Sequence, residues 1–107
     1  MATTRVLIIE DDADINNIVA THLTRAGYTC TQAFSGTEAK LLLDSGNSPM
    51  DDVVICDLML PGLPGEELVR LMRERDQDTP IIVISARTAA SDKVDLLKLG
   101  ADDYLAK

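Results

Sequence analysis

Aromatic and basic residues are scarce in this chain of 107 residues. It has no tryptophan, one phenylalanine and two tyrosines, so aliphatic side chains must form most of any core. Eighteen acidic side chains against ten lysines and arginines give a formal net charge of −8. Binding to nucleic-acid phosphates needs clustered lysine and arginine, so we expect no direct binding of nucleic acid. No apolar run approaches the roughly 18 residues of a membrane span, and we expect no membrane binding.

Cysteines are few, and the start of the chain has no leader-like pattern. Cys30 and Cys56 lack CxxC spacing, and both fall in segments that resemble strands. The opening residues, MATTRVLIIEDD, contain a four-residue apolar run that acids follow at once, unlike a secretory signal peptide. We therefore expect buried, reduced thiols in a cytoplasmic protein.

Short apolar runs alternate with helical patterns along a chain long enough for one domain with a single core. The segments predicted to be strands are 6–9, 28–34, 53–57, 80–85 and 103–106. Between them, apolar residues recur at helical spacing in 15–26, 36–44, a segment that begins at Pro64, and 89–99. This alternation implies a parallel sheet with right-handed crossovers and with helices on both faces. The continuous runs are typical of strands that are buried on both faces.

Local signals mark the ends of several predicted helices. Ser35 and Glu38 form a capping box at the start of the second helix. Gly27 and Gly100 end two helical patterns, as glycines do after a helix. His22, the only histidine, falls on the inner stripe of the first helix, where we expect it to pack rather than to take part in chemistry.

Polar residues stand at the carboxyl ends of four of the five predicted strands: Glu10, Asp11 and Asp12, then Asp57, Ser85 and Lys107. The carboxyl ends of parallel strands share one edge of a sheet, which is where ligands bind in such folds. Taken singly, each acid could equally be a helix cap or a solvated turn, and Asp12 is placed to cap the first helix. Taken together, oxygen ligands without histidine or cysteine favour a hard cation, Mg²⁺ or Mn²⁺ in its place. A carboxylate beside such an ion and an ammonium group can attack a phosphoryl group.

These residues resemble the receiver domain of bacterial two-component response regulators over essentially the whole chain. The resemblance rests on VLIIEDD, VVICDLMLPGLPG, PIIVISAR and LGADDYLAK in this order, and DLMLPG and GADDY are most similar to the OmpR/PhoB-type subfamily. It implies a flavodoxin-like, doubly wound, five-stranded parallel sheet in the order 2-1-3-4-5. The family pattern continues past Lys107 into a fifth helix, so we expect residues 1–107 to be a receiver domain truncated before that helix.

The resemblance implies a metal site and a phosphoryl acceptor. Asp57 would accept the phosphoryl group, and the cation would be Mg²⁺, with Mn²⁺ as a substitute. The implied protein ligands are the carboxylates of Glu10, Asp11 and Asp57 and the backbone carbonyl of Met59.

The resemblance also implies a switch. Ser85 would be the hydroxyl that moves toward the phosphoryl group, and Lys107 would bind that group with its ammonium. Tyr104 would then turn inward and remodel the face formed by the fourth helix and the fifth strand.

The implied function is phosphorelay signalling that controls an output, transcription in this subfamily. The implied partners are a sensor histidine kinase, a second copy bound through the face of the fourth helix and fifth strand, and a C-terminal DNA-binding domain in the parent protein. We expect a phosphoacceptor that assists its own phosphorylation and dephosphorylation, and not a turnover enzyme.

Three alternatives fit the sequence less well. A pseudo-receiver, a plain interaction module, usually lacks the acid pair, the acceptor aspartate or the lysine, and all of these are present. A phosphatase of the haloacid dehalogenase type needs a second aspartate two residues after the nucleophile, where this chain has Met59. A nucleotide-binding α/β domain needs a glycine-rich loop after the first strand, where this chain has acids.

Overall fold

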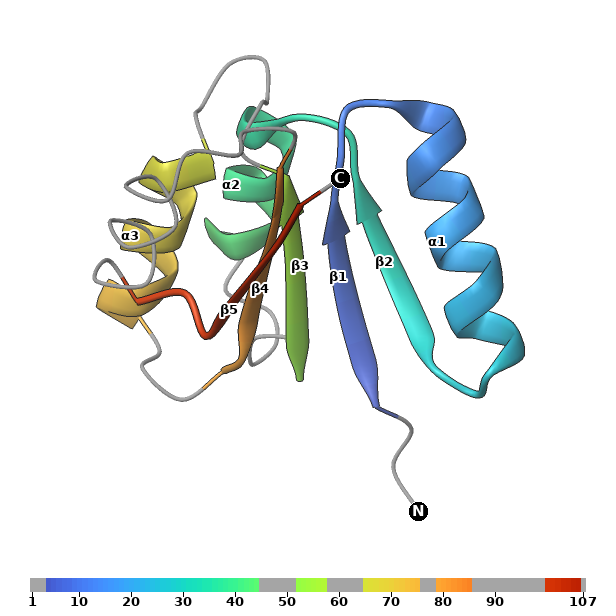
Figure 1. Ribbon diagram of the computed structural model, residues 1–107. Helices are drawn as coiled ribbons and strands as arrows, with labels where there is room; N and C mark the ends of the chain where they lie inside the picture. The colour runs from blue at the N-terminus through green and yellow to red at the C-terminus, as the bar shows by residue number, and fades with distance from the viewer. Residues whose placement is uncertain (1–3, 45–51, 58–64, 76–78, 86–99, 107) are drawn as a thin grey trace.

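The computed structural model describes residues 4–44, 52–57, 65–75, 79–85 and 100–106, with the backbone alone at 75, 85 and 104–106. Within these residues five strands and three helices follow one another along the chain (Figure 1). They are β1 (Arg5–Ile9), α1 (Ala13–Arg25), β2 (Thr29–Ala33), α2 (Gly36–Asp44), β3 (Val53–Asp57), α3 (Gly65–Arg75), β4 (Ile81–Ser85) and β5 (Asp103–Ala106). The helix predicted at 89–99 lies outside the described residues. Pro64, the predicted first residue of the helix before it, also lies outside them.

All five strands are parallel and form one sheet in the order β2-β1-β3-β4-β5. The predicted sheet order is therefore confirmed. β1 lies between β2 and β3, and Val6 pairs with Cys30 on one side and Val53 on the other. Because the strands are parallel, their carboxyl ends meet at one edge, which is the edge that carries the predicted acids.

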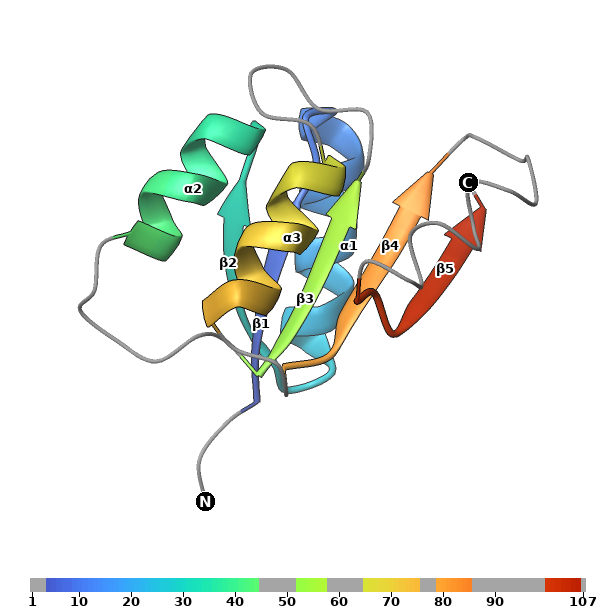
Figure 2. The same ribbon diagram turned by 90° about the vertical axis from the view of Figure 1, so that its left-hand side faces the viewer.

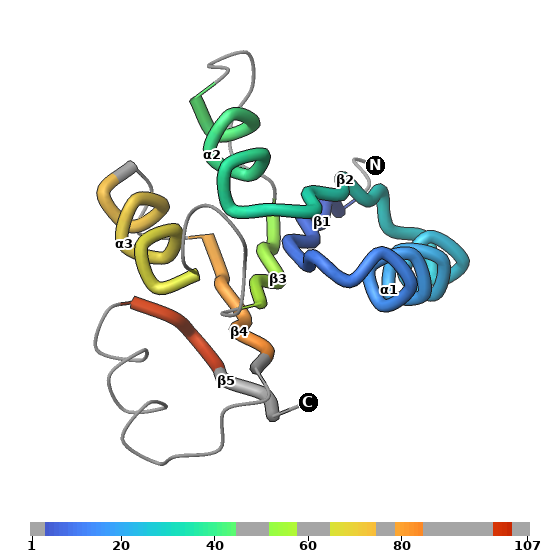
Figure 3. The backbone as a smooth tube through the Cα atoms, turned by 90° about the horizontal axis from the view of Figure 1, so that it is seen from above, coloured from blue at the N-terminus to red at the C-terminus, as the bar shows by residue number. Residues whose placement is uncertain are grey.

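The described helices cover the two faces unequally, since α1 lies on one face and α2 and α3 lie on the other (Figures 2 and 3). The main core fills the face of α2 and α3 and contains mostly aliphatic side chains, as the lack of aromatics predicts. On the opposite face Ile55, Ile82 and Ile84 are half-buried. The prediction that the strands are buried on both faces is therefore confirmed on one face and met only in part on the other, where α1 is the one helix described. None of the described helices has both the length and the hydropathy of a membrane span.

The ends of α1 and α2 are fixed by the caps that the sequence indicates. The carboxylate of Asp12 accepts hydrogen bonds from the backbone N–H groups of Asp14 and Ile15, at 3.0 and 3.2 Å. At the start of α2, Oγ of Ser35 accepts from the backbone N–H of Glu38 at 3.0 Å. Such caps satisfy backbone donors that a helix leaves unpaired.

The inner face of α1 differs from the predicted one. Ile15 and Ile18 are 39% and 57% exposed, and His22 is also exposed. The prediction that His22 packs inward was therefore wrong. The fully buried residue of α1 is instead Asn16, which is adjacent to the predicted stripe.

Arg73, near the end of α3, holds the starts of β4 and β5 together. Its guanidinium donates to the carbonyl oxygens of Gly100 and Thr79, both at 2.6 Å, and to the carboxylate of Asp102 at 2.5 Å. The same carboxylate accepts from the backbone N–H of Ile81 at 2.7 Å. Gly100 has φ +124°, a conformation that side chains other than glycine rarely adopt. These bonds place β5 beside β4 in the observed register.

Candidate functional site

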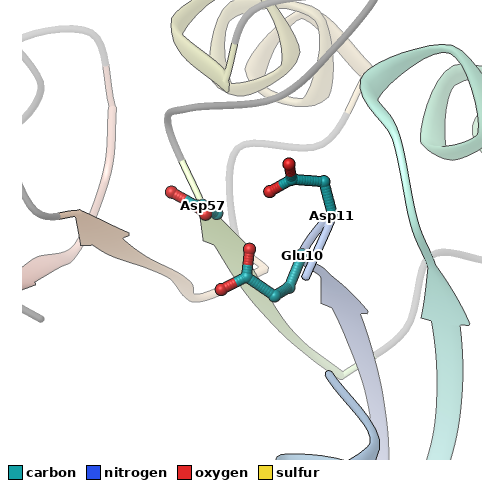
Figure 4. A group of neighbouring side chains, drawn as sticks. All are labelled: Glu10, Asp11 and Asp57. Carbon is teal, nitrogen blue, oxygen red and sulfur yellow. The ribbon is translucent and has the colours of Figure 1, made fainter. Parts of the chain in front are cut away.

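Three acids come together at the carboxyl edge of the sheet. Glu10 and Asp11 follow β1 directly, and Asp57 is the last residue of the neighbouring strand β3. One carboxylate oxygen from each residue lies within 4.8 Å of the other two (Figure 4). In the described part of the chain no other group of three or more acids, histidines or cysteines is this close. We call these three residues the acid cluster.

The acid cluster is buried on one side and open on the other. Asp57 and Glu10 are 3% and 5% exposed, whereas Asp11 is exposed. Buried charges are costly unless they are paired or bind a metal ion. Like charges at this spacing also repel, so a cation would relieve the strain. An ion in solution would reach the cluster from the side on which Asp11 is exposed.

The donor set fits a hard cation. All three side chains offer carboxylate oxygen, and the buried sulfur of Cys56 is a poor ligand. Burial raises the pKa of the Cys56 thiol well above its usual value, and the negative charges of Asp57, Glu66 and Glu10 raise it further. Its sulfur instead donates to the backbone carbonyl of Asp57 at 3.4 Å. Oxygen ligands of this kind suit Mg²⁺ or Mn²⁺.

An apolar cavity of about 170 Å³ lies beside the acid cluster, on the face of the sheet that carries α1. Its walls are mainly isoleucine side chains from β1, β3, β4 and α1, together with Glu10 and Asp57. Apolar surroundings lower the local dielectric constant. They therefore strengthen the electrostatic interactions of Glu10 and Asp57 with any ion or phosphoryl group that the acid cluster binds.

The other predicted site residues are less fully described. The backbone of Ser85 ends β4, one residue beyond Ile84, which pairs with Asp57. Ser85 pairs in turn with Ala106 of β5, so both lie at the edge that carries the acid cluster. Tyr104 lies in β5. For both Ser85 and Tyr104 the structure describes the backbone but not the side chain. Met59 and Lys107 lie outside the described residues, so their roles remain predictions.

Two residues beside the acid cluster were not predicted to matter. Asn16 and Gln32 form a hydrogen-bonded pair, with Nε2 of Gln32 2.9 Å from Oδ1 of Asn16, and Asn16 also donates to the backbone of Glu10. The signal in the sequence is an amide in the middle of an apolar helical pattern. That signal alone does not say which partners the amide finds.

The chain matches the family model of the response regulator receiver domain over residues 6–107. It is 40% identical, over 96% of its length, to the transcriptional regulatory protein QseB of Escherichia coli O157:H7. The chain spans only 46% of QseB, so it corresponds to about half of such relatives.

Solved structures agree with this match. A response regulator protein of Burkholderia pseudomallei, with a phosphorylated aspartic acid, a calcium ion and citrate, has a TM-score of 0.87 and 29% identity, covering 97% of this chain and 59% of that one. The response regulator TrrA of Thermotoga maritima, in complex with Mg²⁺-BeF, has a TM-score of 0.82 and 31% identity, covering 98% of this chain and 87% of that one.

Proposed function

The chain belongs to the response regulator receiver domain family, and on that premise we propose that Asp57 accepts a phosphoryl group in a reaction that depends on Mg²⁺. The observation that carries the proposal is the position of Asp57 at the end of β3, with a carboxylate oxygen within 4.8 Å of one from Glu10 and one from Asp11. The phosphorylated aspartic acid of the Burkholderia relative and the Mg²⁺-BeF of TrrA support it.

The reaction is a transfer between two nucleophiles. A carboxylate oxygen of Asp57 attacks phosphorus, the bond from phosphorus to the donor nitrogen or oxygen breaks, and the donor leaves with that electron pair. The burial of Asp57 limits its contact with water and fixes the attacking oxygen at the sheet edge. When bound, Mg²⁺ supplies positive charge to the carboxylates and to the phosphoryl oxygens.

Each residue at the edge has a proposed task. Glu10 and Asp11, with Asp57 and the carbonyl oxygen of Met59, hold the cation. Lys107 binds a phosphoryl oxygen with its ammonium, as a charge-assisted hydrogen bond. Ser85 donates its hydroxyl to another oxygen once the phosphoryl group is in place. The position of Ser85 at the end of β4 supports this task.

The consequence of phosphorylation is a change of surface and not product turnover. Movement of Ser85 toward the phosphoryl group frees space into which Tyr104 turns, and the face of β5 and residues 89–99 changes. Met59 lacks the acid–base group that rapid hydrolysis needs, so the phosphoryl group stays long enough to act as a signal.

The partners follow from the family. We propose a cytoplasmic protein whose phosphoryl donor is a sensor histidine kinase and whose active form pairs with a second copy through the face of β5 and residues 89–99. Its output is transcription through a C-terminal DNA-binding domain. The match to about half of a transcriptional regulatory protein supports this arrangement.

Incubation with acetyl phosphate tests the proposal without the kinase. With Mg²⁺ present we expect the intact mass to increase by one phosphoryl group, and we expect no increase in EDTA. Asp57→Asn should lose the adduct, whereas the matched control Asp44→Asn, which changes an exposed acid at the end of α2, should keep it. No adduct in the wild-type chain with Mg²⁺ would instead indicate a pseudo-receiver.

A further inference from the structure

Asn16 is buried completely near the start of α1, beside the acid cluster but not part of it. A buried amide is costly unless its donors and acceptor are paired. Nδ2 of Asn16 donates to the carbonyl oxygens of Glu10 and Ala33, each at 3.0 Å. Oδ1 accepts from Nε2 of Gln32 at 2.9 Å. The opposite orientation of the amide is excluded, because it would set Oδ1 against two carbonyl oxygens.

These hydrogen bonds converge on the backbone around Asp11. The carbonyl of Glu10, which accepts from the Asn16 side chain, belongs to the peptide that joins Glu10 to Asp11. The backbone N–H of Asn16 donates to the carbonyl of Asp12 at 2.9 Å, on the other side of Asp11. The N–H of Glu10 is also held, by the carbonyl of Ala33 at 3.0 Å. The side chain of Asn16 therefore holds the carbonyl between Glu10 and Asp11, and the first helical hydrogen bond of α1, which any residue at position 16 would make, holds the carbonyl of Asp12.

We propose that Asn16 is a positioning residue for the divalent cation. This inference rests on the metal site of the proposed function. Its hydrogen bond to the carbonyl of Glu10 fixes the Glu10–Asp11 peptide and, through it, the spacing of the two carboxylates. Gln32 holds the amide of Asn16 in the orientation that makes this bond. The helical pattern of α1 is interrupted by an amide for this reason.

The two common hard cations respond differently to ligand spacing. Mg²⁺ demands a near-octahedral arrangement at about 2.0–2.1 Å, whereas Ca²⁺ accepts more ligands in a flexible geometry. A residue that fixes the spacing of carboxylates therefore matters more for Mg²⁺ than for Ca²⁺. A residue that only stabilises the fold would affect both ions equally.

The test compares the affinities of both ions in variants of the whole chain. Asn16→Leu removes the donors at similar volume, and Asn16→Ala is the second variant should the larger apolar group prevent folding. Gln32→Met is the intermediate variant, because it removes the hydrogen bond that orients the amide of Asn16 but leaves the donors of Asn16 in place. Titration of each metal alone, followed by backbone amide resonances, gives the two dissociation constants, and thermal unfolding confirms that each variant is folded.

We expect the Asn16 variants to weaken Mg²⁺ binding about tenfold or more, as loss of hydrogen bonds behind metal ligands commonly does. The same variants should weaken Ca²⁺ binding by less than about threefold. Gln32→Met should retain more of the Mg²⁺ affinity than either Asn16 variant. Unchanged Mg²⁺ affinity in a folded Asn16 variant, or equal losses for both ions, would overturn the role of Asn16. A wild-type chain that binds neither ion would overturn the metal site itself.

Discussion

Replacement of Asp57 by asparagine should stabilise this chain when no divalent cation is present. The substitution removes one charge from the acid cluster, whose oxygens lie within 4.8 Å of one another, and keeps the volume of the side chain. Two unit charges at 4.8 Å repel by about 3.5 kcal/mol at an effective dielectric constant of 20, and by about 1 kcal/mol in bulk water. Because Glu10 is buried and Asp11 is exposed, we expect a gain of about 1–3 kcal/mol in the free energy of unfolding.

Urea unfolding followed by far-ultraviolet circular dichroism measures this gain, first in EDTA and then in excess Mg²⁺. A ligand that binds the folded state alone raises the free energy of unfolding with its concentration. The wild-type chain should therefore gain stability from Mg²⁺, and Asp57→Asn should gain less. The difference between the two chains should narrow or reverse when Mg²⁺ is added.

Asp44→Asn is the matched control for this experiment. Asp44 is paired with Lys40 on the exposed surface of α2, with 2.7 Å between Nζ and Oδ2, and such pairs contribute little. We expect a change of less than about 0.5 kcal/mol in the free energy of unfolding, equal with and without Mg²⁺. If Asp57→Asn destabilises the chain in EDTA, or if Mg²⁺ stabilises both chains equally, repulsion within the acid cluster is not the cause.

Three further predictions concern the fold. Gly100→Ala should lower the free energy of unfolding by about 2 kcal/mol or more, because φ is +124° and the new Cβ would lie 2.5 Å from Cγ of Arg73. Urea unfolding measures this loss, and an unchanged midpoint would contradict the close packing of Arg73 on Gly100. Asp12→Ala should lower the free energy of unfolding by about 1 kcal/mol, because the cap of α1 is lost. Asp12→Asn keeps a capping oxygen and should lower it less, and equal losses in urea unfolding would exclude capping as the cause. The raised pKa of Cys56 favours the folded state below its ordinary value of 9.0, so this stabilisation should be lost as pH rises above about 9. Cys56→Val should lack this loss, and parallel pH profiles of unfolding would refute it.

The strands were predictable because local composition determined them. Residues 53–57 and 103–106 are strands within the predicted bounds, and 28–34 differs from β2 by one residue at each end. The parallel order then follows from the alternation of strands and helices. The same topology explains why Glu10, Asp11 and Asp57 could be expected at one edge before any distance was known.

The face that α1 presents to the sheet could not be predicted in the same way. Periodicity indicates an apolar stripe, but it does not determine the rotation of the helix about its axis. Burial of Asn16 depends on carbonyl groups of Glu10 and Ala33, which the chain brings together from 6 and 17 residues away. The clamp of Arg73 on Asp102 spans 29 residues and was equally hidden. A hydropathy pattern counts both side chains simply as polar, so their buried hydrogen bonds leave no trace in it.

Chemical identification of the phosphorylated residue tests the central claim most directly. After reaction with acetyl phosphate and Mg²⁺, borohydride reduces an aspartyl phosphate to homoserine, which tandem mass spectrometry locates in the sequence. The proposed function predicts homoserine at position 57 and at no other aspartate, with none formed in EDTA. Homoserine at a different position, or a phosphoryl group that is bound with Mg²⁺ but resists borohydride, would contradict it.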